Sequence, residues 1–146
     1  MKWQVVAIGK PSLSYAKDGV AEYLKRLRRY ASVELVNGWK EAGQEKNSAQ
    51  LLSASEGSLR IALDERGEMW TTDTLVKHVE GWQMDGVKRV AFLIGGADGH
   101  TKELRKEADH VVAMSGLTLQ HELALVVLLE QIYRVHTILK GEPYHR

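Results

Sequence analysis

The chain has 146 residues, enough for one domain with its own hydrophobic core. Its formal net charge of +1 neither requires nor excludes a nucleic-acid partner. The absence of cysteine excludes disulfides, thiolate catalysis and cysteine-based zinc sites, and it favours an intracellular protein. No apolar run approaches the roughly 20 residues that cross a bilayer, so we expect no membrane segment.

The first half of the chain predicts alternating strands and helices. A mainly apolar strand is expected over residues 3–8, followed by a helix to about Tyr30 that Ser12 or Ser14 caps. Four cations of that helix either form a solvated face or contact phosphate: Lys25, Arg26, Arg28 and Arg29. The next predicted elements are a strand over 33–36, a polar loop over 37–47, a weak helix over 48–55 and a strand over 59–63 that ends at Asp64-Glu65-Arg66-Gly67.

The second half continues the alternation. Thr71 or Thr72 is expected to cap a helix over 73–83, and Thr101 a short helix over 101–108. Strands are predicted over 90–94 and 111–114, and a last helix over 120–139. Residues 124–129 of that helix are apolar all round. Because a second subunit is the easiest cover for such a helix in a small chain, we predict a homodimer.

This order of elements favours a mainly parallel α/β sheet with helices on both faces, in a single domain over 1–146. The strand over 90–94 is followed by glycines at 95, 96 and 99, which let the backbone turn sharply and approach another group closely. Ligands of open α/β sheets lie outside the carboxyl ends of the strands. The glycine-rich turn is therefore the predicted binding crevice, although an ordinary strand and turn have the same pattern.

Several well-known motifs are absent. The three glycines do not make the dinucleotide fingerprint G-x-G-x-x-G, and there is no P-loop. His121-Glu122 begins like the zinc motif H-E-x-x-H, but Leu125 stands where the second histidine belongs, and we predict no metal site. His78 and His110 suit surface or packing positions, and His136 suits a polar position in an interface.

Four segments in order carry a specific resemblance: Leu93-Ile94-Gly95-Gly96-x-x-Gly99, Ser115-x-Leu117-Thr118-Leu119, Leu129-Glu130-Gln131-x-Tyr133-Arg134 and Pro143-Tyr144-His145-Arg146. Over essentially its whole length the chain resembles the RlmH (YbeA-like) family of ribosomal RNA large-subunit methyltransferases, part of the SPOUT superfamily. The resemblance implies a C-terminal trefoil knot, S-adenosylmethionine as methyl donor and a cytoplasmic homodimer. The implied reaction is methylation of N3 of a pseudouridine in large-subunit (23S) ribosomal RNA, on the ribosome.

The same resemblance implies the site residues. The cofactor is expected to contact Leu63, Gly95, Met114, Ser115, Gly116, Leu117, Thr118 and Leu119. The implied catalytic residues are Tyr144, His145 and Arg146, although chain ends are more often frayed. His145 would accept the N3 proton or orient the base, Tyr144 would stack on it or hydrogen-bond it, and Arg146 would bind phosphate. Arg134 would hold the tail or RNA, or pair with Glu130.

Two positions depart from the family pattern. Ala97-Asp98 stands where members often have Pro-Glu, and Leu125 where they usually have an arginine. If that arginine contacts RNA, this chain must obtain the contact elsewhere. The main alternative is a non-catalytic RNA- or ribosome-binding module of the same fold, and a third hypothesis is a flavodoxin-like small-molecule binder.

Overall fold

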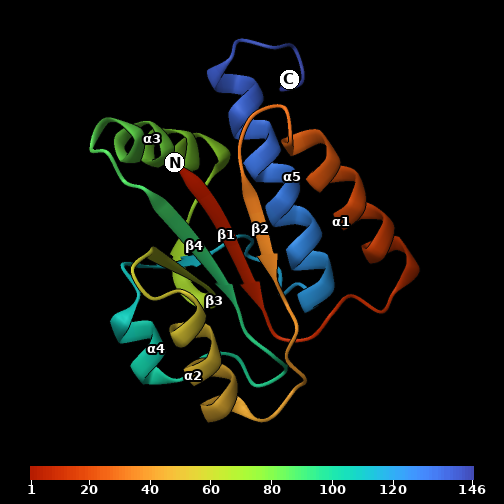
Figure 1. Ribbon diagram of the computed structural model, residues 1–146, viewed down its shortest axis with the longest axis vertical. Coiled ribbons are helices and arrows are strands. Elements are labelled where there is room, and N and C mark those ends of the chain that lie inside the picture. The colour runs from red at the N-terminus through yellow and green to blue at the C-terminus, as the bar shows by residue number, and fades with distance from the viewer.

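The predicted alternation of strands and helices is confirmed in a computed structural model that describes residues 1–146 (Figure 1). The elements are β1 (Lys2–Ala7), α1 (Ser14–Leu27), β2 (Val33–Val36), α2 (Gln44–Ala54), β3 (Leu59–Met69), α3 (Thr72–Met84), β4 (Arg89–Ile94), α4 (Lys102–Glu107), β5 (His110–Ala113) and α5 (His121–Leu139). All strand pairs are parallel, in the order β2-β1-β4-β3-β5. The strand before the glycines, β4, is thus the central strand.

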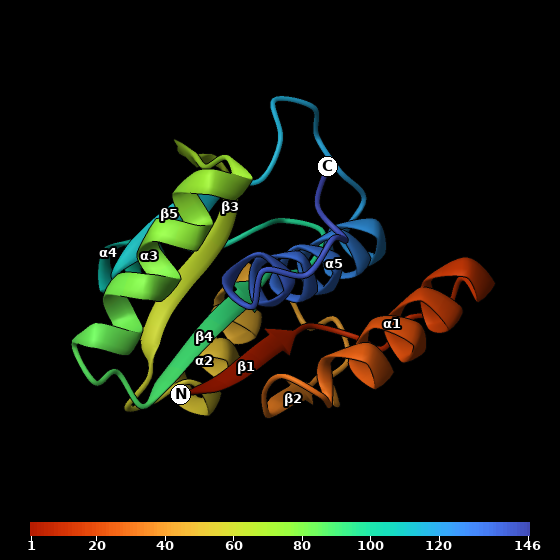
Figure 2. The same ribbon diagram turned by 90° about the horizontal axis from the view of Figure 1, so that it is seen from above.

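Helices cover both faces of the sheet, as predicted. Alternate residues of β4 point to opposite sides, so Phe92 joins one hydrophobic core and Leu93 another. The larger core contains apolar side chains of α1, α3 and α5, and the smaller contains Leu51 of α2 and Leu104 of α4. On the larger side α5 runs beside α1, as both views show (Figures 1 and 2). No helix combines the length and apolar character needed to span a membrane.

The strand predicted over 59–63 is longer than expected, because β3 continues to Met69. Its pairing with β5 shifts register between Leu63 and Glu68, so the polar stretch between them forms an irregularity within the strand rather than its end. Gly67 lies here against the backbone of Val111, where a Cβ atom would be only 2.5 Å from the carbonyl carbon. The absence of a side chain at Gly67 therefore lets β3 pass close to β5.

Two predicted caps are confirmed and one is wrong. The side chains of Thr71 and Thr101 accept hydrogen bonds from the first turns of α3 and α4. Neither serine caps α1: its N-cap is Leu13, whose N–H donates to the Glu122 carboxylate over 3.0 Å. The N–H of Ser12 donates to the same oxygen over 2.6 Å. The cap comes from a residue about 110 positions away, which local sequence patterns cannot reveal.

The apolar helix α5 is largely covered by its own chain. Leu125, Leu128 and Leu129 are buried in the core shared with α1 and α3. Val126 and Val127 are half-buried, and Leu123 is exposed. The chain itself therefore supplies much of the cover that was expected from a second subunit, and the homodimer stays a prediction.

The prediction for His136 is wrong, because its ring lies in the core rather than in an interface. The indole N–H of Trp3 donates to His136 Nε2 over 2.9 Å, which requires a neutral imidazole. His78 and His110 are packing residues, as one of the two alternatives predicted. The His78 ring stacks on Trp70 with their centroids 4.1 Å apart, and the His110 ring lies edge-on to both.

We expect the two most buried histidines to make the fold less stable in mild acid. Burial lowers the pKa of His100 and of His136 below the ordinary value near 6.5. Below that pH the unfolded chain binds protons that the folded chain does not. The free energy of unfolding should therefore fall as pH drops from about 6.5 towards the lowered pKa values, by up to about 1.4 kcal/mol per pH unit for each histidine.

Urea unfolding at pH 7.5, 6.5 and 5.5 measures this slope. The variant His136→Gln keeps an acceptor for the Trp3 indole but has no proton to bind, so its slope should be shallower. Equal stability of the unaltered protein at pH 7.5 and 5.5 would contradict the expectation.

Candidate functional site

A cavity of about 400 Å³ lies where β4 and β5 end, beside the irregular middle of β3 and the start of α5. This volume is within the range of small-molecule sites. Its lining comes from four segments: Leu63, Asp64, Glu65, Arg66; Ile94, Gly95, Gly96, Ala97, Asp98, Gly99; Ala113, Met114, Ser115, Leu117, Thr118, Leu119; and His121, Ala124. The predicted crevice is therefore a real cavity.

Most residues that the resemblance singled out for the cofactor line this one cavity. Leu63, Gly95 and five members of the 114–119 loop contribute to its wall. Gly116 does not, because it faces β3: a Cβ there would lie 3.7 Å from the methyl group of Met69. Sequence patterns alone missed the charged lining residues Asp64, Glu65 and Arg66, which had the composition of an ordinary turn.

Gly95 is tightly enclosed behind the cavity. A Cβ atom there would lie 3.2 Å from the carbonyl carbon of Gly99 and 3.2 Å from the His100 ring. That ring is fully buried, and its Nε2 lies 3.1 Å from the carbonyl oxygen of Leu93. The absence of a side chain at Gly95 therefore lets the glycine turn fold back over the end of β4 and leaves the cavity open.

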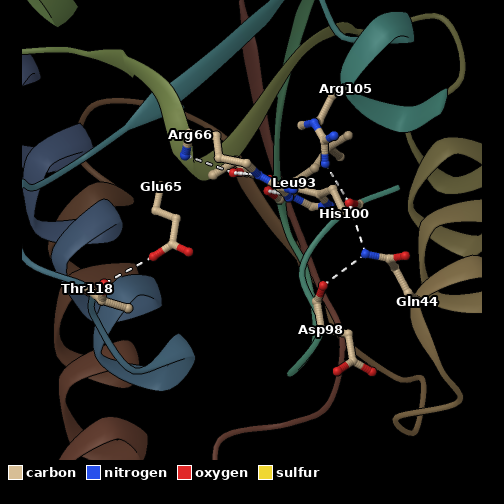
Figure 3. Close-up of polar contacts among 9 residues, drawn as sticks. Gln44, Glu65, Arg66, Leu93, Asp98, His100, Arg105 and Thr118 are labelled. Carbon is tan, nitrogen blue, oxygen red and sulfur yellow. Dashed lines mark hydrogen bonds and ion pairs between the residues drawn. The ribbon is translucent and has the colours of Figure 1, made fainter. Parts of the chain in front are cut away.

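The glycine turn is also anchored from its outer side. The Glu41 carboxylate accepts a hydrogen bond from the N–H of Ala97 over 2.8 Å. Gln44 donates to the carbonyl oxygens of Asp98 and His100 over 2.9 and 3.2 Å (Figure 3). Hydrogen bonds from Gly43, Asn47 and Ala97 lower the pKa of Glu41. Two residues of the predicted polar loop over 37–47, Glu41 and Gln44, therefore hold the glycine turn in place through hydrogen bonds.

The loop over 115–119 presents unpaired backbone groups to the cavity. Apart from the N–H of Leu117, which donates to Ser115 Oγ over 2.9 Å, these residues make no backbone hydrogen bond within the chain. The Leu117 side chain is 79% exposed. Free N–H and C=O groups beside an exposed apolar side chain suit the edge and face of a heterocyclic base.

The two sides of the cavity mouth are joined by one side-chain contact. Thr118 Oγ1 donates to Glu65 Oε2 over 3.0 Å, so the 115–119 loop is tied to β3 (Figure 3). The next residue along the strand, Arg66, turns instead to Asp64, which it contacts through Nε and Nη2. Burial acts to raise the pKa of Asp64, but the hydrogen bonds from Arg66 outweigh it and hold that pKa below its ordinary value.

The predicted catalytic tail does not reach this cavity within the chain. Tyr144 donates to Glu130 Oε2 over 2.9 Å, and Arg134 Nη1 donates to His145 Nδ1 over 3.0 Å. Glu130 lies at the middle of α5 and Arg134 in its C-terminal half, whereas the cavity touches only His121 and Ala124 near its start. Arg134 also pairs with Glu130 over 2.8 Å, so two of its predicted roles, holding the tail and pairing with Glu130, occur together.

The fold and the cavity define a class: a parallel α/β protein with a cavity of small-molecule size between a glycine turn and a backbone loop. Residues 1–145 match the family described as "Predicted SPOUT methyltransferase". The chain is 49% identical to ribosomal RNA large subunit methyltransferase H of Thermus thermophilus, over all of this chain and 99% of that protein. It is 41% identical to the protein of that name from Deinococcus radiodurans, over 100% and 99% of the two chains.

Among solved structures, a putative RNA methyltransferase from Bacillus anthracis shares the fold, with a TM-score of 0.57 at 12% identity and 99% coverage of both chains. The chain therefore belongs to the SPOUT methyltransferases, in the family of ribosomal RNA large subunit methyltransferase H. The predicted resemblance is confirmed at the level of the family.

Proposed function

We propose that this protein uses S-adenosylmethionine to methylate N3 of a pseudouridine in large-subunit (23S) ribosomal RNA, as a cytoplasmic homodimer with a knotted C-terminal part. The names of the relatives support ribosomal RNA as the substrate class. The cavity supports the cofactor, because it combines apolar walls, unpaired backbone groups and charged residues at its mouth. Those features match, in turn, the adenine, its polar edge and the charged methionine end.

The cofactor, when bound, supplies an already activated methyl group, so the protein's task is chiefly to position it and the base. Leu63, Met114 and Leu119 offer apolar contacts, and the 115–119 backbone offers hydrogen bonds. The carboxylates of Asp64, Glu65 and Asp98 outnumber the single guanidinium of Arg66 among the lining residues. This excess of negative charge favours a cationic ligand over a neutral one.

The tail side chains His145 and Tyr144 are suited to donate hydrogen bonds rather than to accept a proton. Because an arginine can only donate, the Arg134 contact to Nδ1 leaves neutral His145 with its proton on Nε2. Burial and hydrogen bonds to Tyr23 and Glu130 raise the pKa of Tyr144, so its hydroxyl stays protonated. His145 Nε2–H is then suited to donate to a carbonyl oxygen of the base beside N3, which stabilises the negative charge that the base gains as N3 loses its proton to water.

Exposed cations beside the tail support contact with RNA. Lys25, Arg28 and Arg29 at the end of α1 are exposed, and Arg29 lies 3.9 Å from Glu142 of the tail. Leu125 is 3% exposed within the core, so this position has no access to RNA. We therefore place the phosphate contacts of this protein on α1 and the tail.

The proposal of a homodimer rests on the separation between the cavity and the tail within one chain. Tyr144 and His145 contact Glu130 and Arg134, which follow the last cavity residue of α5, Ala124, by 6 and 10 positions, or about 9 and 15 Å along the helix. Because the tail is bound to α5 and none of its residues lines the cavity of its own chain, we infer that a catalytic tail serves the cavity of a partner subunit.

Mixed dimers test this arrangement. A Gly95→Val chain has a tail but a damaged cavity, and a chain lacking residues 144–146 has a cavity but no tail. Each homodimer should be inactive on ribosomes, whereas the purified mixed dimer should regain about half of the turnover because one of its two composite sites is intact. An inactive mixed dimer would show that the tail does not act across subunits.

The alternative of a non-catalytic RNA-binding module makes a different prediction. Calorimetry at millimolar S-adenosylmethionine would then detect no binding.

A further inference from the structure

Arg66 is held rigidly at the mouth of the cavity. Its Nε and Nη2 atoms each donate to a different oxygen of Asp64 over 2.9 Å, and its backbone N–H donates to the same carboxylate. The Asp64 side chain is only 3% exposed, whereas the Arg66 side chain is 54% exposed. A buried carboxylate thus fixes an accessible guanidinium, which lowers the entropy lost when a ligand binds to it.

One edge of the Arg66 guanidinium, formed by Nη1 and Nη2, has N–H groups without a partner in the chain. The guanidinium has five N–H groups, and Asp64 takes the one on Nε and one on Nη2. The remaining three, two on Nη1 and one on Nη2, have no partner within the chain. The Nη1–Nη2 edge has the spacing that binds a carboxylate through two parallel hydrogen bonds.

The free edge lies beside the glycine turn. The Nη2 atom is 3.7 Å from the position that a Cβ atom at Gly99 would occupy. Neighbouring acidic side chains do not occupy it: Glu65 turns away to Thr118, and Asp98 has no contact with Arg66 (Figure 3). Arg66 is the only lysine or arginine among the lining residues, so an anionic ligand group has one strong partner here.

We propose that Arg66 binds the carboxylate of the methionine end of S-adenosylmethionine, with Asp64 as its positioning residue. The proposal rests on the function proposed above. It makes Arg66 a specificity-determining residue, because the free edge recognises a carboxylate and not the adenosyl group, which the glycine turn and the 115–119 loop contact.

Calorimetry tests this role by measuring the affinity of two ligands for the unaltered protein and for its variants. The ligands are S-adenosylmethionine and its decarboxylated form, which keeps the adenosyl group and the sulfonium but lacks the carboxylate. The proteins are the unaltered chain, Arg66→Gln and, as a matched loss of charge, Lys102→Gln at the start of α4. The ratio of the two affinities within each protein cancels differences in protein stability, and Lys102→Gln controls for the extra positive charge of the decarboxylated ligand.

Hydrogen bonds between charged groups contribute enough to change affinity roughly tenfold or more. Arg66→Gln should therefore lower the preference for the carboxylated ligand by about tenfold, and Lys102→Gln should leave it unchanged. Arg66→Lys should retain part of it, because the charge remains but the two-pronged geometry is lost. An unchanged ratio in Arg66→Gln would overturn the role of Arg66, whereas an unaltered protein that binds neither ligand would overturn the proposed function itself.

Discussion

Replacing Gly95 by valine is expected to abolish binding of S-adenosylmethionine, lowering affinity by a factor of about 100 or more. A single Cβ atom at this position already lies 3.2 Å from the Gly99 carbonyl carbon and from the His100 ring. The two additional methyl groups of valine must either displace the glycine turn, which Glu41 and Gln44 hold in place, or project into the cavity. Both outcomes remove the space that the ligand needs.

Calorimetry on Gly95→Ala and Gly95→Val measures the effect as a series, in which alanine should weaken binding less than valine. Gly81→Ala is the matched control, because nothing lies within 4 Å of its Cβ position on α3 and alanine favours a helix. Thermal unfolding of each variant separates a damaged cavity from a damaged fold. A folded Gly95→Val protein that binds the ligand as tightly as the unaltered chain would refute this placement of the site.

Removing Tyr144, His145 and Arg146 should preserve binding of S-adenosylmethionine, in contrast to Gly95→Val, but should stop methyl transfer. The deletion leaves every lining residue of the cavity in place, so the affinity for S-adenosylmethionine should stay within about twofold. Methyl transfer to ribosomes should fall by roughly 100-fold or more, which is the usual cost of removing a hydrogen-bond donor that stabilises developing negative charge. The free energy of unfolding should fall by only about 1 kcal/mol, because His145 and Arg146 are exposed and Tyr144 is half-buried.

Single-turnover methylation and calorimetry on the same preparation separate these effects. Lys140→Gln, an exposed substitution just after α5, is the control and should retain normal turnover. Within the tail, His145→Gln should keep more activity than His145→Ala, because the glutamine amide still donates a hydrogen bond. Full turnover by the truncated protein would mean that the chain end is simply frayed.

Most of the sheet was predictable from local patterns. The apolar run before Gly95, the threonines that begin α3 and α4, and the order of strands and helices all reflect interactions between residues near each other in the chain. Periodic burial and turn chemistry are local properties, so they are visible in sequence. The resemblance added the 115–119 loop as an expected cofactor contact, because its residues carry too little periodicity to be found otherwise.

The sequence by itself therefore determined the α/β class, the central strand with its glycine turn, and the family. Only the tertiary structure decided which distant residues meet: Glu122 at the start of α1, His136 under Trp3, and Thr118 with Glu65 at the cavity mouth. It also placed the tail against Glu130 and Arg134 of α5 rather than in the cavity. Such contacts depend on how whole elements pack against one another, and no short stretch of sequence records that packing.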